Sequence, residues 1–208
     1  MLSDRRATAE LPDHGELWSR PWRVDDHGPD RLTLSLRVPR GPYRFRRALR
    51  LAPAAARLEL DYAVENEGER PLDFTWCLHA LCALEAGMQL ELPDGAALRV
   101  PDPREAGFAP RATKRFYGPL ERGRVALRAA TGRESLRISF DPAQIPFLGL
   151  WLNFGGWSGA GGAPYWNAGL EPSIGDADSL DDACARGTAA RLEPGARRSW
   201  RVAIELGP

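Results

Sequence analysis

Alternation of apolar and polar residues with a period of two recurs along most of this 208-residue chain. Successive side chains of a β-strand point to opposite faces, so this alternation predicts strands with one buried face. Turn-forming clusters separate the alternating segments, among them PRGP (39–42), ENEGERP (65–71) and LPDG (92–95). The segments that the pattern predicts most clearly as antiparallel strands are residues 31–38, 43–51, 57–65, 124–130, 134–140 and 199–206.

Helical patterns are rare. Residues 178–186, DSLDDACAR, predict one short helix, opened by Asp178 or Ser179 as the cap and carrying acidic residues in its first turn. Many short strands with little helix predict an all-β fold, a large antiparallel β-sandwich, rather than an α/β fold. No internal repeat or long linker divides the sequence, so we expect residues 1–208 to form a single domain. The Gly-rich stretch 154–164 matches no phosphate-binding motif and predicts a mobile loop.

Composition narrows the classes of partner. Twenty-eight basic residues balance 28 acidic ones, so no excess charge draws the chain to nucleic acid or to a membrane surface. No apolar run approaches the roughly 18 residues of a membrane span, and we expect a cytoplasmic protein. Cys77, Cys82 and Cys184 are odd in number and lack CxxC spacing, which indicates reduced, buried thiols. The only lysine, Lys114, stands among many arginines and indicates coding bias rather than a binding patch.

His79 is the single ionisable group near the centre of an apolar run, FTWCLHALCALEAG (74–87). An imidazole inside an apolar strand must find a hydrogen-bond partner or bear a desolvation cost of about 1 to 3 kcal/mol. The run alone fits a core histidine as well as a proton carrier.

Glu171 ends a second apolar segment, just before Pro172. A glutamate opposite a histidine in an apolar pocket would favour the imidazolium, raise the pKa of the histidine and make an acid–base pair. If residues 165–171, YWNAGLE, form a strand, alternation places Asn167, Gly169 and Glu171 on one face, where the glycine leaves room for a sugar ring.

His14 and Arg20 lie in DHGELWSRPW (13–22), a polar stretch that leads into two tryptophans. The stretch fits a turn followed by core tryptophans, and it equally fits a sugar site, because a pyranose offers apolar faces to aromatic rings and hydroxyls to polar groups. A further alternative is a metal triad of His14, His79 and Glu171. His27 lies among turn formers and is interpreted as a solvated loop residue.

Five segments together resemble one known superfamily. In order and spacing, the sequence resembles the aldose 1-epimerase (galactose mutarotase-like) superfamily, including its hexose-6-phosphate 1-epimerase branch. The segments that carry the resemblance are DHGELWSRPW (13–22), FTWCLHALCALEAG (74–87), LGLWLNFGGW (148–157), GLEPSIGDADSL (169–180) and LEPGARRSWRVAIEL (192–206).

The resemblance implies the superfamily's large antiparallel β-sandwich, with the site on the concave face of one sheet. It implies interconversion of sugar anomers, with His79 as general acid toward the ring oxygen and Glu171 as general base on the anomeric hydroxyl. His14 would bind hydroxyls of a sugar or sugar phosphate, and no metal or cofactor is expected. We also expect Arg20, Trp76 and Asn167 to bind the substrate.

The chain begins 13 residues before His14, where superfamily members carry several more strands. We therefore expect an N-terminally shortened sandwich, with a homodimer as one way to cover the exposed sheet edge. The alternative function is a non-catalytic carbohydrate-binding domain of the same fold.

Two structural expectations complete the hypothesis. A gap wide enough for a pyranose should separate Glu171 from His79. The tryptophans near these segments should be mostly buried, with at least one of them flanking the pocket that holds His79; they are Trp18, Trp22, Trp76, Trp151 and Trp166.

Overall fold

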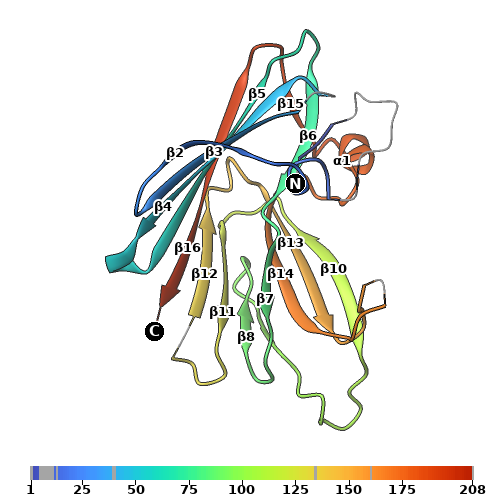
Figure 1. Ribbon diagram of the computed structural model, residues 1–208. Helices are drawn as coiled ribbons and strands as arrows, with labels where there is room; N and C mark the ends of the chain where they lie inside the picture. Colours follow the sequence, from blue (N-terminus) through green and yellow to red (C-terminus); the bar gives the residue numbers. More distant parts are fainter. Residues whose placement is uncertain are drawn as a thin grey trace.

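A computed structural model describes residues 2–4, 12, 14–38, 41–133, 135–159 and 161–207. Its strands form two large sheets that lie against each other as the two layers of a sandwich (Figure 1). All pairs of named strands are antiparallel. The predicted fold class, an all-β antiparallel sandwich, is confirmed.

Within the described residues, the larger sheet has nine strands. In spatial order they are β2 (Arg23–His27), β3 (Arg31–Val38), β4 (Tyr43–Ala52), β5 (Arg57–Asn66), β16 (Arg197–Gly207), β12 (Ser135–Phe140), β11 (Arg124–Arg128), β8 (Gln89–Glu91) and β9 (Ala97–Arg99).

The smaller sheet has seven strands in the part of the chain that the structure describes. Its main path is β1 (Leu2–Asp4), β6 (Leu72–Cys77), β14 (Trp166–Ile174), β13 (Phe147–Phe154) and β10 (Arg111–Tyr117). Two short strands extend it, since β7 (Ala80–Ala83) pairs with β14 and β15 (Ala190–Leu192) pairs with β6.

Helices play a small part, as predicted. The α-helix α1 (Leu180–Arg186) begins at Ser179, whose hydroxyl accepts hydrogen bonds from the backbone N–H groups of Asp181 and Asp182. A 3₁₀ turn, η1 (Pro53–Ala55), joins β4 to β5. No helix in the described ranges has the length and hydropathy of a bilayer span.

The hydrophobic core lies between the two sheets. Alternate residues of β14, Ala168, Leu170 and Ile174, are buried there, and Trp200 and Val202 of β16 face them from the larger sheet. Each Å² of apolar surface that is buried contributes about 25 cal/mol of stabilising free energy, so this contact is the main stabilising element of the sandwich. It also leaves the opposite face of the smaller sheet outside the core.

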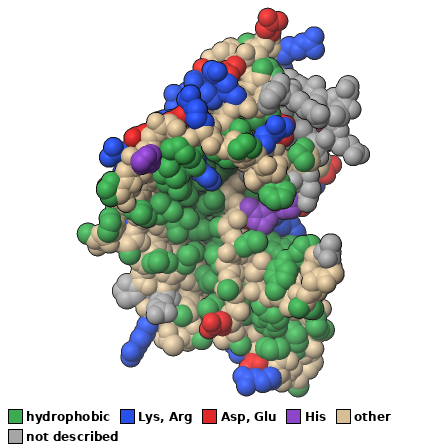
Figure 2. Space-filling model, in the orientation of Figure 1, with side chains coloured by type: hydrophobic (Ala, Val, Ile, Leu, Met, Phe, Trp, Pro, Cys, Tyr) green, Lys and Arg blue, Asp and Glu red, His purple; other side chains and the backbone are tan. Residues whose placement is uncertain are grey.

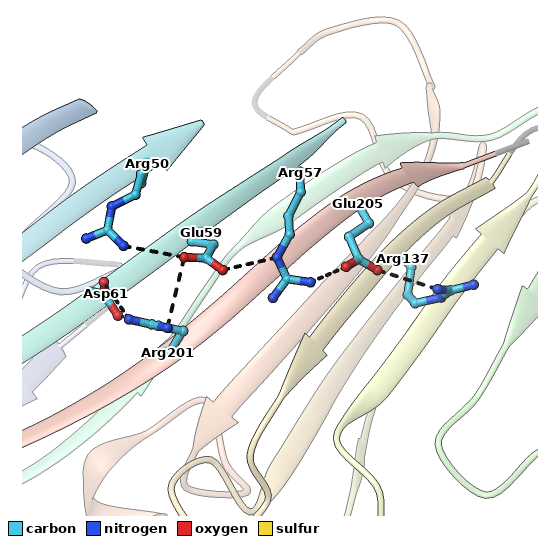
Figure 3. Close-up of polar contacts among 7 residues, drawn as sticks. All are labelled: Arg50, Arg57, Glu59, Asp61, Arg137, Arg201 and Glu205. Carbon is cyan, nitrogen blue, oxygen red and sulfur yellow. Dashed lines mark hydrogen bonds and ion pairs between the residues drawn. The ribbon is translucent and has the colours of Figure 1, made fainter. Parts of the chain in front are cut away.

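The outer face of the larger sheet carries a lattice of ion pairs (Figure 3). Glu59 of β5 lies 3.2 Å from Arg57 and 3.6 Å from Arg50, and Glu205 of β16 lies 3.4 Å from Arg137. These charges alternate along the strands with core residues, as the period-two pattern predicts for a sheet with one solvated face.

Most of the alternating segments are strands with nearly the predicted bounds. The segment 31–38 is β3, and 43–51 and 57–65 fall within β4 and β5. The segment 124–130 is strand only as far as Arg128, and 199–206 lies inside the longer β16. Residue 134, which opens the remaining segment, lies outside the described residues.

The apolar run 74–87 differs from its prediction as one strand. It forms β6 and β7, separated by Leu78 and His79. The backbone N–H of Leu78 donates to the carbonyl of Pro172, and the N–H of Ala80 donates back to the carbonyl of Leu78, both at 3.1 Å. These bonds interrupt the regular ladder, so His79 occupies a break between two strands.

The three cysteines form no disulfide, as expected, but only Cys77 is buried. Cys82 and Cys184 are half-buried.

Candidate functional site

The candidate site lies on the face of the smaller sheet that points away from the core. Residues paired across an antiparallel sheet project to the same side, so the register defines the floor of the site. One row runs Lys114, Trp151, Gly169 and Leu81 across β10, β13, β14 and β7. The neighbouring row runs Phe116, Gly149 and Glu171.

Glu171 lies inside β14, not at its end, because the strand continues through Pro172 to Ile174. Its side chain shares the site face with Asn167 and Gly169, while Ala168 and Leu170 are in the core. This distribution confirms the predicted alternation. The residue is 1% exposed, which is unusual for a carboxylate.

Two glycines make space for the Glu171 carboxylate. A Cβ atom at Gly169 would lie 2.5 Å from Glu171 Oε1, and one at Gly149 would lie 3.1 Å from Oε2. The sequence assigned the space at Gly169 to a sugar ring, but the carboxylate itself fills it. Any side chain at Gly169 would therefore displace the acid group.

The two carboxylate oxygens have different surroundings. Oε2 accepts a hydrogen bond from Lys114 Nζ and lies 4.0 Å from Cys77 Sγ. Oε1 is buried and has no hydrogen-bond partner among the described residues. His79 Nε2 lies 3.8 Å from Oε1, within ion-pair range but too far for a hydrogen bond. Oε1 therefore retains the capacity to accept a hydrogen bond from a ligand.

The predicted gap of pyranose width between His79 and Glu171 is wrong, since the two side chains approach within 3.8 Å. Gly149 and Gly169 leave space for the carboxylate against the sheet, and there Oε1 lies next to the imidazole of His79.

His14 joins this pair from the segment that precedes β2. It occupies a turn with a positive φ of 63°, and its ring centroid lies 5.3 Å from that of His79. The structure thus brings His14, His79 and Glu171 together, as predicted, from segments distant in sequence. Figure 2 shows histidine side chains in a recess between the upper and lower parts of the surface.

Burial lowers the pKa of His79 below its ordinary value of 6.5. The nearby Glu171 carboxylate acts in the opposite direction, and the charges of Lys114 and His14 lower the pKa further. Glu171 therefore raises this pKa, as predicted, but burial outweighs its effect and the net shift is downward. The cation Lys114, on the far oxygen of the same carboxylate, opposes a second positive charge on His79.

Asn167 also lies on the site face and is buried. Its Oδ1 accepts a hydrogen bond of 3.2 Å from Trp151 Nε1, which fixes the indole beside Gly169. The ring of Trp151 packs edge to face with that of Trp157, at 5.9 Å between centroids. Asn167 therefore supports an aromatic wall next to the carboxylate.

One predicted binding residue, Trp76, lies elsewhere, and a second, Arg20, is paired with a carboxylate. Trp76 faces the core, where it packs against Tyr62 and Trp200 at centroid distances of 4.7 and 5.0 Å. It lies opposite Ile174 in the register and so occupies the other face of the sheet from Glu171. Arg20 pairs with the buried Glu16 at 2.9 Å, where its charge is already compensated.

The tryptophan prediction is partly wrong as well. Trp18 is 69% exposed, and its ring lies edge-on to His14 at 6.1 Å. Trp22, Trp151 and Trp166 are half-buried rather than fully buried.

Lys114 is the site residue that the sequence analysis missed. Its side chain is 20% exposed and contacts Glu171 on one side and Asp178 at 3.7 Å on the other. A single lysine on the strand RATKRFY resembles any solvent-facing residue, so the only signal was its uniqueness among many arginines. Within the described ranges, no group of three or more His, Cys, Asp or Glu side chains is placed to hold a metal ion.

Comparison with known proteins defines the class of the fold. The chain has the galactose mutarotase-like fold, in agreement with the resemblance seen in its sequence. The Slr1438 protein of Synechocystis sp. PCC 6803 superposes with a TM-score of 0.70 at 19% identity, over 95% of this chain and 69% of that one.

Two further solved structures have related names. A protein of Escherichia coli K12 described as a candidate aldose 1-epimerase has a TM-score of 0.70 at 18% identity, over 93% of this chain and 70% of that one. A galactose mutarotase-like protein of Lactobacillus casei has a TM-score of 0.59 at 15% identity, over 98% and 80% respectively. No family model and no curated protein matches the sequence.

Proposed function

We propose that the chain is an aldose 1-epimerase, which interconverts the anomers of a small sugar by acid–base ring opening and closure. The observation that carries the proposal is the Glu171 carboxylate, buried yet with Oε1 unpaired, 3.8 Å from His79 Nε2. Side chains at this separation can each come within about 2.6 to 3.2 Å of two oxygens on one carbon. The fold shared with galactose mutarotase-like proteins supports the same reading.

The proton transfers balance with these two groups alone. Glu171 takes the proton of the O1 hydroxyl while the imidazolium of His79 gives a proton to O5. The C1–O5 bond then breaks and C1 becomes an aldehyde. After rotation of C1, closure on the other face returns both protons and gives the opposite anomer. A well-placed proton-transfer group contributes about 10² to 10⁴ in rate, and the reaction already proceeds slowly in water.

The neighbouring side chains support recognition of a sugar. Trp151 offers an apolar surface beside the carboxylate, and His14 lies against His79 with polar ring nitrogens. The recess at the centre of Figure 2 gives the histidines access to solvent. We infer a small sugar or sugar phosphate as the ligand.

Saturation-transfer NMR on equilibrated aldoses tests the proposal. The wild-type protein should accelerate exchange between the two anomeric proton signals. Glu171→Gln keeps the shape of the side chain and removes the base, so exchange should fall about 10²- to 10⁴-fold. Sugar affinity, measured by ligand-observed NMR, should change much less.

Arg115→Gln is the matched control, because Arg115 is exposed and its Cα pairs with Leu150 of the core-facing register. Its exchange rate should equal that of the wild type. Binding of sugar without accelerated exchange would reject the isomerase and favour the non-catalytic carbohydrate-binding domain.

A further inference from the structure

Lys114 is the only lysine of the chain and reaches the candidate site from the edge strand β10. Its Nζ donates to Glu171 Oε2 and lies 3.7 Å from Asp178 Oδ1. It also lies 5.4 Å from the ring centroid of Phe116, the next residue of β10 on the same face. The ammonium group is therefore held between a buried carboxylate, an exposed carboxylate and an aromatic ring.

The position of Lys114 decides which oxygen of Glu171 faces a ligand. Its ammonium group engages Oε2, while Gly149 and Gly169 leave room for the carboxylate to lie flat against the sheet. Oε1 is left next to His79 with no hydrogen bond. A free carboxylate could rotate to exchange its two oxygens, whereas this one is fixed by an ion pair at one end.

Burial makes the charge of Lys114 as important as its shape. An ionised carboxylate that loses its solvent takes up a proton unless an opposite charge compensates it. Among the residues that the structure describes, the groups that face Glu171 are Lys114 from β10, Cys77 from β6 and His79 from the break after β6. Beyond them, Asp178 faces Lys114 and His14 faces His79.

Among these groups Lys114 is the one that carries a positive charge at neutral pH. Burial raises the pKa of the Cys77 thiol and lowers that of His79, so both favour their neutral forms. Asp178 is negative and 70% exposed, which reduces its influence.

We propose that Lys114 is the positioning residue of this site: its ammonium group keeps Glu171 ionised and turns Oε1 toward His79 and the substrate. The inference rests on the proposed function for its kinetic consequence, but the state of Glu171 itself can be measured without any activity.

The test replaces the charge in two ways. Lys114→Met keeps the length of the side chain without charge, and Lys114→Gln keeps a hydrogen-bond donor without charge. At pH 7 both should exchange anomers at least about tenfold more slowly than the wild type, with KM changed much less than kcat. Relative to the wild type at the same pH, their rates should recover as the pH rises, because hydroxide then removes the proton that Lys114 no longer excludes.

Two comparisons separate positioning from simple structural support. Lys114→Arg restores the positive charge and should restore the pH profile of the wild type. Arg115→Met removes a charge from the next position of β10 and should leave the profile unchanged. Equal slowing of the Met and Gln variants at every pH, with no recovery at high pH, would show only structural support and overturn the inference.

A second measurement does not depend on catalysis. The carboxyl carbon of ¹³C-labelled Glu171 reports by NMR whether the group is ionised at pH 7. We expect it to be ionised in the wild type and in Lys114→Arg, and substantially protonated in Lys114→Met and Lys114→Gln. If Glu171 stays fully ionised in the uncharged variants, Lys114 does not have this role. If the four proteins show the expected ionisation of Glu171 but the wild type does not accelerate anomer exchange, the proposed function fails while the role of Lys114 stands.

Discussion

The outer face of the larger sheet and the site face of the smaller sheet both carry charged residues, but the two faces differ in how these charges are solvated and paired. On the outer face, Arg57 lies between Glu59 and Glu205, and each partner retains contact with water (Figure 3). On the site face, one carboxylate, Glu171, is almost wholly buried, and only one of its oxygens accepts a hydrogen bond from a described residue. Paired charges in water contribute little, whereas an incompletely paired buried charge is costly.

The difference shows how to locate chemistry in a chain with many charges. Charged side chains are more numerous on the outer face, where many arginines have a carboxylate neighbour. The site is distinguished instead by a buried carboxylate oxygen that has no hydrogen-bond partner among the described residues, which a folded protein retains at a cost of about 1 to 3 kcal/mol. A buried carboxylate of this kind is therefore a better guide here than the number of charges.

His79 provides the largest expected effect. His79→Ala should slow anomer exchange about 10²- to 10⁴-fold while the β-sheet circular dichroism remains unchanged. In the wild type the lowered pKa of His79 adds a pH signature. If the imidazolium is the acid, kcat/KM should fall about tenfold per unit as the pH rises past a midpoint below 6.5.

The sign of this dependence is decisive for the role of His79. The neutral ring cannot supply the proton, so activity must decline as the ring loses it. A rate that rises with pH through the same midpoint would make neutral His79 the proton acceptor and reverse its assigned role. If the rate shows no midpoint below pH 6.5 in either direction, His79 takes no part in the mechanism.

Gly169 provides the next largest effect. In Gly169→Ala the new Cβ would lie 2.5 Å from Glu171 Oε1 and 3.0 Å from Trp151 Cβ, so the carboxylate must move. We expect a loss of about 1 to 3 kcal/mol in the free energy of unfolding by urea, together with loss of exchange.

Gly207→Ala is the control for this substitution, since its new Cβ would meet Ser135 Oγ at 3.4 Å, an ordinary contact. It should unfold close to the wild type. A Gly169→Ala protein with wild-type stability and exchange would contradict the placement of the carboxylate against Gly169.

The smallest effect is expected on the outer face. Glu59→Gln removes the charge that contacts Arg50, Arg57 and Arg201, yet these arginines remain substantially exposed. The free energy of unfolding should fall by less than about 1 kcal/mol, less still in high salt, with exchange unchanged. A loss of several kcal/mol would mean that the lattice acts as a cooperative network and would remove the contrast between the two faces.

The strands of the larger sheet could be predicted because their alternation of apolar and polar residues has a single cause: one face of the sheet is buried and the other is exposed to solvent. The segment 31–38 is β3 at both ends for this reason. Helix α1 could be predicted equally well, since Ser179 and the acidic residues after it form a local N-cap pattern. The sequence pattern predicted an element correctly wherever interactions between neighbouring residues determine its structure.

The site could be predicted only in part, because it depends on register. The residue types and order suggested His14, His79 and Glu171, but no local pattern places Trp76 in the core or Lys114 above Glu171. Lys114 reaches the carboxylate because β10 pairs with β13 and β13 with β14, which together bring two residues 57 positions apart in sequence into contact. The break at His79 likewise depends on a hydrogen bond to Pro172, which the apolar run does not reveal.

The position of Glu171 in the middle of β14 has a consequence for divergence. The strand pairs with β13 from Trp166 to Ser173, and on its other side it pairs with β7 as far as Leu170 and with β6 from Ser173. The acid group is thereby built into the scaffold, while Trp18, Trp157 and Tyr165 stand exposed on connecting segments around it. Those segments can be lengthened, shortened or replaced without moving the carboxylate, so laboratory evolution of ligand preference should begin with them.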